Sequence, residues 1–520
     1  HRDEMWVANE IKGNLQCVAM SCSNLVTKHV VRGKCQHFSR YLAEHKGAED
    51  FFRPLMSHYG PSRLNRKAFL KDLLKYSGEL IVGVVDCDTF ENAYNFTASL
   101  LRSHGFEGRK FITDTDEIFQ SLNMKAAVGA MYAGKKRDYF EGYTNHQKDE
   151  IIFQSCLRLY KGYLGIWNGS LKAELRPNEK NELNKTRVFT AAPLDTLLGG
   201  KVCVDDFNNL FYDKHIECPW TVGMTKFYTG WDQLLRKLPD GWVYCDADGS
   251  QFDSSLSPYL INSILRLRLE FAEDWDEGKQ MLRNLYTEIV YTPILVPDGT
   301  VVKKFKGNNS GQPSTVVDNT LMVVLAMHYS LIKEGWNHDD IKRDIVFFAN
   351  GDDLIMAIKP DKACTLDKLQ ENFLALGLKY DFSNRTTDRS NLWYMSHQGL
   401  IIDDLYIPKL EMERIVSILE WNRSDTPLHR AEAICAAMIE AWGYPDLLQQ
   451  IRKFYMWLSV QDDFRQVSED CLLPYISEIA LRRLYTSKEP ASDELRRYYE
   501  KYILNSLETS DETINWVEFQ

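Results

Sequence analysis

The stretch FFANGDDLIMA, residues 347–357, places two adjacent carboxylates, Asp352 and Asp353, between two apolar runs. Asn-Gly between apolar segments is the strongest short-range signal for a β-hairpin, so residues 345–349 and 354–358 are predicted to form antiparallel strands. Like charges this close repel each other, and burial adds to the free-energy cost of keeping both carboxylates ionised. A divalent cation that binds both carboxylates removes the repulsion. The same tripeptide also fits a solvent-exposed turn, because Asn, Gly and Asp favour turns.

A second acidic cluster, CDADGSQFDSS (245–255), lies at the end of a predicted strand over residues 242–248. We expect Asp248 from this cluster to lie beside Asp352 on adjacent strands of one small sheet. Two ions held there ~3.5–4 Å apart would activate an attacking oxygen and stabilise the leaving oxygen of an in-line displacement. Mg²⁺ suits such a site because it often binds only one or two protein carboxylates together with substrate phosphates. The predicted substrate is therefore a phosphate ester or anhydride.

The segment NNSGQPSTVVDNTLM (308–322) lies between the two acidic clusters, and residues 314–332 are predicted to form a helix. Its flexible start, Ser310-Gly311, allows the backbone to approach a ligand closely, because glycine lacks a Cβ atom. One face of the helix would then present the side chains of Thr315 and Asn319, which suit a sugar hydroxyl. Helix capping by the serines of the segment is an equally good interpretation.

The main basic cluster lies in LKAELRPNEKNELNKTRVF (171–189), where glutamates interleave with the positive residues. The cluster comprises Lys172, Arg176, Lys180, Lys185 and Arg187. A solvated, salt-bridged surface is the simplest interpretation. The alternative is a ribbon whose cations neutralise a triphosphate and stabilise charge in the transition state. Pro177-Asn178 disfavours one continuous helix here and favours a loop or ribbon.

Three further elements frame these segments. A helix capped by Ser254 or Ser255 is predicted to carry Pro258 in its first turn. Its apolar residues fall on one face: Leu260, Ile264, Leu267 and Phe271. Another helix over residues 365–376 precedes a predicted strand over 378–382.

The bulk properties of the 520-residue chain predict about three folding units or one large assembly. A net charge of −11 excludes a uniformly basic nucleic-acid binder, although local clusters decide where phosphates bind. We find no secretory signal and no apolar run of the ~20 residues that a membrane-spanning helix needs. Eleven scattered cysteines indicate a reducing compartment. A zinc site is a weak alternative to ordinary thiols for Cys17, Cys22, Cys35 and His37.

The order of the clusters, a basic segment followed by D-x4-D, S-G-x3-T-x3-N and G-D-D, resembles the motif set of viral RNA-dependent RNA polymerases. CDADGSQFDSSLSP and SGQPSTVVDNTLM are similar to the polymerases of the potyvirus family in particular. The resemblance covers most of the chain and is densest from about residue 170 to 410. It implies an α+β fold with the shape of a closed right hand, whose palm is a small antiparallel sheet with helices.

The resemblance also implies where the parts of the hand begin and end. Helix-type spacing beyond about residue 409 agrees with a helical thumb. The expected parts are fingers over 1–205 with an N-terminal extension and the basic ribbon, a palm over 206–405 with a fingers insertion near 280–310, a mostly helical thumb over 406–507, and a loose acidic tail over 508–520.

The roles of single residues are carried over from the family's motifs. Asp248 and Asp352 would be the principal ligands of Mg²⁺, or of Mn²⁺ as the alternative ion, and Asp353 an auxiliary ligand. Asp253 and Asn319 would sense the ribose 2′-hydroxyl. The template and incoming nucleotide would be held by Ser310, Gly311 and Thr315. The nucleotide triphosphate would be bound by the basic cluster: Lys172, Arg176, Lys180, Lys185 and Arg187. The candidate general acid for pyrophosphate would be Lys379.

The activity implied is template-directed RNA synthesis, in which a primer 3′-hydroxyl attacks an NTP during replication of a positive-strand RNA virus genome. The implied partners are RNA template and primer, NTPs, a genome-linked protein primer and other viral replication proteins. The implied location is membrane-associated sites in the host cytoplasm, and the host nucleus. Release from a polyprotein is expected because the chain opens at His1 and ends in WVEFQ, which is similar to the cleavage sites of the family's own cysteine protease.

Three other classes of function compete with this interpretation. GAMYAGKKR (129–137) is a near match to an ATP-binding P-loop, but Lys136 stands where Ser or Thr should contact Mg²⁺. A basic loop that contacts template phosphates explains the same residues. A nucleotidyl cyclase would use two carboxylates on a small sheet but has no place for the basic ribbon. A non-enzymatic RNA scaffold would not need intact Asp248, Asp352 and Asp353.

Overall fold

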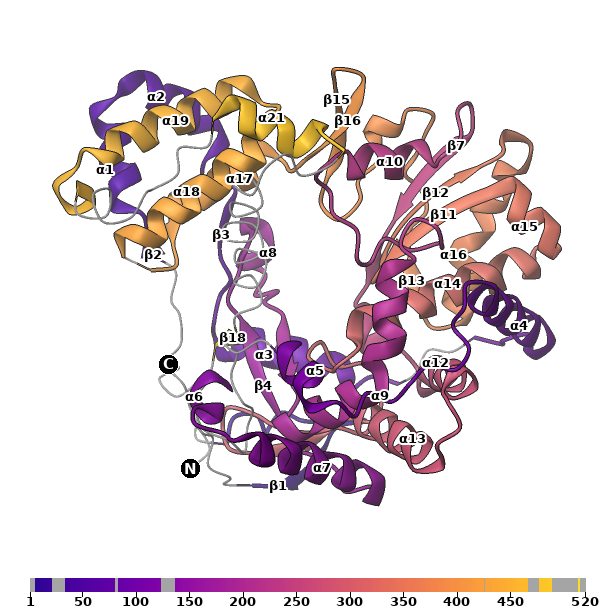
Figure 1. Cartoon of the computed structure of the whole chain (residues 1–520). Helices are drawn as coiled ribbons and strands as arrows, with labels where there is room; N and C mark the ends of the chain where they lie inside the picture. The colour runs from indigo at the N-terminus through magenta and orange to yellow at the C-terminus, as the bar shows by residue number, and fades with distance from the viewer. Residues whose placement is uncertain are drawn as a thin grey trace.

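A computed structural model describes residues 5–20, 33–79, 83–122, 136–424, 426–465, 477–488 and 513–514. The chain contains both helices and short strands, and the strands of its four-stranded sheet pair antiparallel, which agrees with the α+β prediction. Figure 1 shows a helical group at the upper left, a sheet flanked by helices on the right, and further helices and strands that join the two along the bottom. The predicted site residues come from one end of this sheet, from neighbouring helices and loops, and from the strands and short helix of the basic segment.

The sheet on the right has four strands in the order β11-β12-β7-β14. Their bounds are β7 Val243–Ala247, β11 Ile345–Asn350, β12 Asp353–Ile358 and β14 Arg385–Thr386. The predicted hairpin is confirmed, and its register pairs Asn350 with Asp353. The turn is therefore Gly351-Asp352, with Gly351 in the left-handed region at φ +57°.

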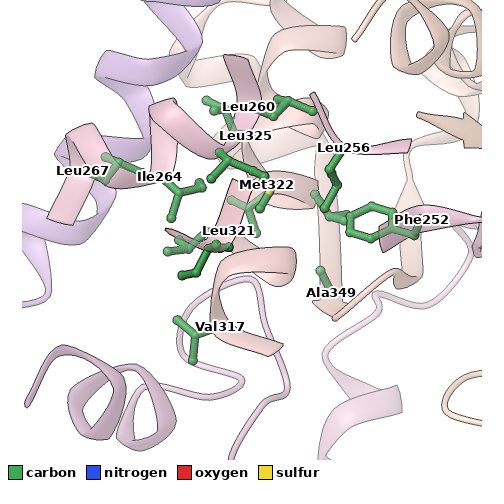
Figure 2. Packing of buried hydrophobic residues seen from close by; sticks show 14 of the residues in the cluster. Phe252, Leu256, Leu260, Ile264, Leu267, Val317, Leu321, Met322, Leu325 and Ala349 are labelled. Atoms are coloured by element: carbon green, nitrogen blue, oxygen red, sulfur yellow. The ribbon is translucent and has the colours of Figure 1, made fainter. Parts of the chain in front are cut away.

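One side of this sheet is covered by α14 (Thr315–Lys333), α12 (Pro258–Phe271), α4 (Cys87–Ser103), α15 (His338–Asp344) and α16 (Leu366–Ala375). The predicted helix from residue 314 is confirmed as α14. Figure 2 shows how the apolar face of α12 meets α14, through Leu260, Ile264 and Leu267 on one side and Leu321, Met322 and Leu325 on the other. Each of these side chains is at most 1% exposed, and burial of each contributes about 1.5–3 kcal/mol.

The prediction of the α12 cap was wrong. Ser254 and Ser255 end a separate short helix, α11 (Phe252–Ser255), and their hydroxyls donate to carbonyls of that helix and its cap. The cap of α12 is Ser257, whose hydroxyl accepts from the backbone N–H of Leu260, and Pro258 occupies the first helical position as predicted.

Helix α14 also corrects the expectation about membrane-spanning length. Within the described ranges, it is the one helix long and apolar enough, by length and composition, to cross a membrane. However, 83% of its 18-residue apolar window is buried inside the molecule. Its hydrophobicity is therefore explained by its position in the protein core.

The helical group beyond residue 409 is confirmed and consists of α17 (Met412–Glu420), α18 (Pro427–Ala441), α19 (Pro445–Ser459) and α21 (Glu478–Thr486). Two N-terminal helices, α1 (Gln36–Glu44) and α2 (Lys46–Phe52), share its hydrophobic core. Phe38 of α1, for example, packs against Phe454 of α19 with ring centroids 5.1 Å apart. The N-terminal extension, expected with the fingers, therefore packs with the C-terminal helices (Figure 1).

The basic segment forms a ribbon with one short helix, as its Pro-Asn pair predicted. Its elements are β4 (Trp167–Lys172), β5 (Leu175–Pro177), α8 (Asn178–Glu182) and β6 (Val188–Ala191). β4 and β6 belong to a second sheet with β1 (Gln16–Ala19), β9 (Pro293–Leu295), β10 (Val301–Lys303) and β18 (Thr513–Ile514). The rest of the predicted acidic tail lies outside the described residues.

The remaining helices and strands connect these groups. The helices are α3 (Arg66–Leu73), α5 (Thr115–Gln120), α6 (Lys136–Phe140), α7 (Asn145–Lys161), α9 (Leu194–Asp213), α10 (Gly230–Arg236) and α13 (Asp276–Val290). The strands are β2 (Gly33–Lys34), β3 (Tyr59–Pro61), β8 (Gly249–Ser250), β13 (Lys379–Tyr380), β15 (Gln398–Ile402), β16 (Leu405–Lys409) and β17 (Trp421–Asn422). The strand predicted over 378–382 is thus shorter, as β13.

The four residues of the zinc alternative have other surroundings. Cys17 is exposed on β1, Cys35 is buried at the start of α1, and Cys22 lies outside the described residues. The His37 ring lies 2.5 Å from a carboxylate oxygen of Asp463. These surroundings favour ordinary thiols and a surface ion pair over a zinc site.

Candidate active site

The carboxylates that were predicted to be catalytic converge at one end of the four-stranded sheet. The β12–β7 ladder pairs Leu354 with Ala247, so the next position along it brings Asp353 opposite Asp248. Asp352, in the hairpin turn, lies beside this pair. Asp248, Asp352 and also Asp253 line one cleft of about 1320 Å³. The predicted meeting of the two acidic clusters in space is therefore found.

Burial and mutual repulsion affect the protonation of these groups. Burial, followed by the charges of Asp253 and Asp248, raises the pKa of Asp352 to about 6. Burial, followed by the charges of Asp352 and Asp248, raises the pKa of Asp353 to about 7. A bound cation would favour the ionised forms of these carboxylates.

The donor set suits a hard divalent cation. It offers carboxylate oxygens at an open cleft, where substrate phosphates and water can complete the coordination of Mg²⁺. Among the residues that the structure describes, no three His, Cys, Asp or Glu side chains already form a closed metal-ligand set.

Three side chains that sequence analysis did not identify hold the hairpin turn in place. The backbone N–H of Gly351 donates to Thr320 Oγ1 at 2.8 Å. Tyr380 Oη donates to the carbonyl oxygen of Asp352 at 2.7 Å, and Asn350 Nδ2 donates to Thr221 Oγ1 at 3.1 Å. The signals for Thr320 and Tyr380 were their places beside Asn319 on a predicted helix and beside Lys379 on a predicted strand, whereas Thr221 lies in a segment without a motif.

The predicted sugar-sensing pair is in contact. Asn319 Nδ2 donates to Asp253 Oδ1 at 2.9 Å, and both residues line the cleft. Burial raises the pKa of Asp253, and the hydrogen bond from Asn319 opposes that shift. A carboxylate held by one amide at one oxygen keeps its other oxygen available for a ligand hydroxyl.

The three residues of the S-G-x3-T motif have different surroundings. Ser310 lines the cleft, and its hydroxyl accepts from the backbone N–H of Thr190. Gly311 approaches protein backbone, because a Cβ atom there would lie 2.3 Å from the carbonyl oxygen of Thr190. Thr315 donates its hydroxyl to the Asn309 carbonyl at 2.7 Å within its own loop. Ser314 is the cap residue of α14 but makes no capping bond with its side chain.

All five residues of the basic cluster line the cleft opposite the aspartates. Glu174 forms ion pairs with both Arg187 and Arg176, so the cluster is salt-bridged and also lines the cleft, while its binding of a triphosphate stays a prediction. Burial and the neighbouring cations lower the pKa of Lys180, while Asp248 acts in the opposite direction. Two further lysines of the cleft, Lys71 and Lys75, carried no motif in the sequence.

Lys379 is exposed on β13 and also lines the cleft. Its strand pairs with β8, where Lys379 lies opposite Ser250, two residues beyond Asp248. The glycines of the P-loop alternative, residues 129–134, and the lysine that follows them lie outside the described residues. The adjacent Lys136 is buried in α6, which lowers its pKa to about 8.

Comparison with known proteins gives the family. A family model described as viral RNA-dependent RNA polymerase matches residues 39–459. The genome polyproteins of Beet mosaic virus, Lettuce mosaic virus (strain 0 / isolate French) and Plum pox potyvirus (strain Rankovic) are 62%, 63% and 60% identical over 95%, 96% and 96% of this chain. The chain spans only 15–16% of the length of these polyproteins. The chain belongs to the viral RNA-dependent RNA polymerases, and within them to the potyvirus group.

Proposed function

We propose that this chain synthesises RNA on an RNA template by transferring nucleotides from NTPs to a primer 3′-hydroxyl. The observation that carries the proposal is the composition of the one cleft. Asp248, Asp352, the sugar-sensing pair and the five cations of the basic ribbon line it, and Asp353 lies opposite Asp248 on the adjacent strand. Separately these groups suit metal ions, a ribose and a triphosphate, and together they suit an NTP.

The divalent ions used by this family are proposed to be Mg²⁺, with Mn²⁺ as the alternative. Asp248 and Asp352 would hold them with Asp353 as auxiliary ligand, and the bound ions would supply charge stabilisation for the attacking and leaving oxygens. The basic ribbon binds the triphosphate and limits its motion. Lys379, exposed in the cleft, is the proposed donor of a proton to the departing pyrophosphate.

The right-hand arrangement is part of the proposal. The sheet β11-β12-β7-β14 with α12, α14 and α16 would be the palm, and α17–α19 with α21 the thumb. The ribbon β4–β6 would belong to the fingers. The packing of α1 and α2 on the thumb core supports a closed hand, because the N-terminal extension then joins the thumb to the fingers.

Partners and location extend the proposal beyond the chain itself. The family binds RNA template and NTPs. A genome-linked protein as primer and other viral replication proteins are proposed as partners on the strength of the potyvirus relatives. Membrane-associated sites in the host cytoplasm, and the host nucleus, are proposed as the location.

Primer extension on a homopolymer RNA tests the proposal. The parent protein with Mg²⁺ is expected to incorporate the complementary NTP only when template is present, and Asp352→Ala to lose on the order of 10²-fold or more in rate. The matched control is Asp274→Ala, which removes a fully exposed carboxylate outside the cleft. Equal incorporation by parent and Asp352→Ala contradicts the metal role. NTP hydrolysis without template would favour an ATPase, and a cyclic product without template would favour a nucleotidyl cyclase. RNA binding without synthesis would favour a scaffold.

A further inference from the structure

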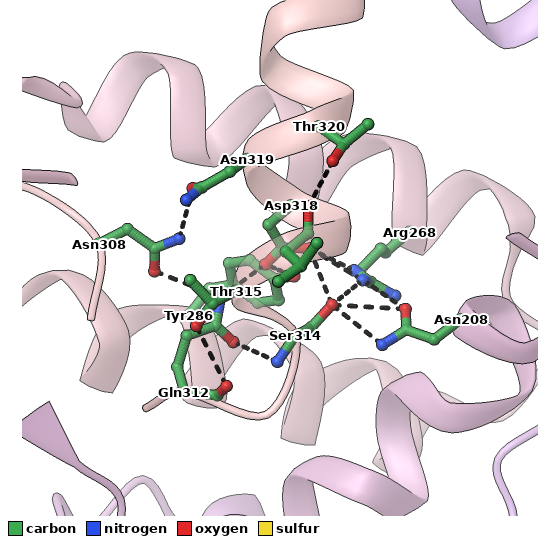
Figure 3. A network of polar contacts seen from close by, with 11 residues as sticks. Asn208, Arg268, Tyr286, Asn308, Gln312, Ser314, Thr315, Asp318, Asn319 and Thr320 are labelled. Carbon is green, nitrogen blue, oxygen red and sulfur yellow. Dashed lines mark hydrogen bonds and ion pairs between the residues drawn. The ribbon is translucent and has the colours of Figure 1, made fainter. Parts of the chain in front are cut away.

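A buried chain of hydrogen-bonded side chains leads from the protein interior to the sugar-sensing pair. It consists of one carboxylate followed by three amides. It begins at Asp318 on α14, which is 1% exposed. Arg268 Nη2 donates to Asp318 Oδ1 at 2.8 Å, and Tyr286 Oη donates to Asp318 Oδ2 at 2.7 Å. Figure 3 shows this ion pair beside the loop that precedes α14. The carboxylate is thus a fixed acceptor whose position is set by two other helices, α12 and α13.

Asp318 determines the orientation of the next residue, Gln312. Gln312 Nε2 donates to Asp318 Oδ2 at 3.0 Å, while Gln312 Oε1 accepts from the backbone N–H of Ser314 at 2.7 Å. An amide nitrogen can only donate and an amide oxygen can only accept. A rotation that exchanged the two atoms would place oxygen against carboxylate and N–H against N–H. Gln312 is 6% exposed, so water offers little compensation.

Gln312 in turn determines the orientation of Asn308. Asn308 Oδ1 accepts from Gln312 Nε2 at 3.2 Å and from the backbone N–H of Asn309 at 2.9 Å. The nitrogen of Asn308 therefore points the other way and donates to Asn319 Oδ1 at 2.9 Å. The backbone of Asn308 is also fixed, because its N–H donates to the carbonyl oxygen of Asp253 at 2.8 Å.

The last amide of the chain is Asn319. Since its oxygen accepts from Asn308, its nitrogen is left to donate to Asp253 Oδ1. In the opposite orientation, the Asn319 oxygen would face the Asp253 carboxylate, and two acceptors repel. Asp253 and Asn319 line the cleft, whereas Asn308 and Gln312 are absent from its lining. The side chains of Gln312 and Asn308 therefore reach the cleft through Asn319 and Asp253, and the Asn308 backbone carbonyl also accepts from the hydroxyl of Tyr76, which lines the cleft.

We propose that Gln312 and Asn308 are positioning residues for sugar selection, which fix the Asn319 amide so that Asp253 presents one free oxygen to the ribose 2′-hydroxyl. The inference rests on the proposed function. Without this constraint, Asn319 samples both orientations and Asp253 rotates, so the 2′-hydroxyl loses a positioned acceptor. A 2′-deoxyribose makes no such bond and loses nothing. The relative preference for ribonucleotides then falls, while chemistry at the carboxylates continues.

The test compares incorporation of ATP, 2′-deoxy-ATP and 3′-deoxy-ATP on a poly(U) template. Asn308→Ala and Gln312→Met are expected to lower the ratio of kcat/KM for ATP over 2′-deoxy-ATP roughly tenfold, as for one hydrogen bond to a charged group. That change corresponds to about 1.4 kcal/mol. The ratio for ATP over 3′-deoxy-ATP is expected to stay at the parent value, because the 3′-hydroxyl has no part in the chain of amides.

The chain offers a matched control in the neighbouring residue. Asn309 is also an asparagine and is fully buried, but its Nδ2 donates to the Ile289 carbonyl and to Thr292 Oγ1, away from the cleft. Asn309→Ala is expected to lower the unfolding temperature and to leave the ATP over 2′-deoxy-ATP ratio unchanged. A selectivity loss caused by general loosening of the loop would appear in this control as well.

Double variants with Asn319→Ala complete the test. If Asn308 acts through Asn319, then Asn308→Ala produces no further fall in the ratio once Asn319 is alanine. The inference is overturned if Asn319→Ala lowers the ratio while Asn308→Ala and Gln312→Met keep the parent value. If Asn308→Ala fails to fold, the selectivity ratio of Gln312→Met decides the test. Methionine is similar in length to glutamine but lacks the polar amide atoms. Absence of RNA synthesis by the parent would instead overturn the proposed function.

Discussion

His328 makes α14 sensitive to acid. It is 2% exposed and packs against Phe96 and Phe347, with ring centroids 4.6 and 5.7 Å away. Its Nδ1 is hydrogen-bonded to Thr97 Oγ1 at 2.8 Å. Burial, together with the charge of His338, lowers the pKa of His328 from 6.5 to about 3. The folded protein therefore holds this imidazole neutral in a pH range in which the unfolded chain protonates it.

The sign and size of the effect follow from proton linkage. Between pH 6.5 and about 3 the unfolded state binds one more proton than the folded state at His328, so stability is present above pH 6.5 and is lost as the pH falls. The loss amounts to about 1.4 kcal/mol per pH unit. From pH 6.5 to 5, the free energy of unfolding is expected to fall by about 2 kcal/mol through this residue alone.

Urea unfolding of the parent and of His328→Gln between pH 7.5 and 5 measures this contribution. At pH 7.5 the variant is expected to be less stable by about 1–3 kcal/mol, because a core side chain has been replaced. As the pH falls to 5, the gap should narrow by about 2 kcal/mol, since glutamine takes up no proton. His397, whose pKa is also lowered to about 3, is present in both proteins and cancels. Parallel stability curves over this range would refute the reasoning.

Three further changes have defined outcomes. Gly311→Ala is expected to cost about 1–3 kcal/mol of unfolding free energy, because its Cβ would meet the Thr190 carbonyl oxygen at 2.3 Å; an unchanged urea midpoint contradicts this. Arg187→Ala is expected to raise KM for NTPs roughly tenfold. The increase in KM should be larger at low salt than at high salt, which steady-state kinetics at two salt concentrations measures. Asp253→Ala is expected to lower the preference for NTPs over dNTPs in competitive incorporation, and an unchanged ratio would remove its sugar role.

Sequence alone predicted the parts that depend on local pattern. The Asn350-Gly351 pair indicated the hairpin, and apolar spacing indicated α12 and α14, because turn chemistry and helix periodicity are encoded within a few residues. The position of the α12 cap was wrong because several serines precede the helix, and only tertiary packing selects Ser257. The hydroxyl of Thr315, expected in the cleft, instead satisfies carbonyls of its own loop.

Local sequence patterns did not predict the contacts between segments that are distant in sequence. Tyr380 and Thr221 hold the turn at Asp352 from segments distant in sequence, and Arg268 pairs with Asp318 across fifty residues of sequence. The packing of α1 and α2 on the C-terminal helices is of the same kind. A single sequence specifies these contacts only through the complete fold, so they appear once the chain is seen in three dimensions.

The central claim is that Asp248 and Asp352 bind the same divalent ions beside an NTP. Electron paramagnetic resonance of Mn²⁺, with primer–template RNA and an unreactive NTP analogue, measures the ions bound to the complete chain. We expect the parent to bind two Mn²⁺ ions in the presence of the analogue, and Asp248→Asn and Asp352→Asn each to weaken this binding by at least about tenfold. The exposed Asp274→Asn should bind as the parent does. Unchanged Mn²⁺ number and affinity in both cleft variants would contradict the account.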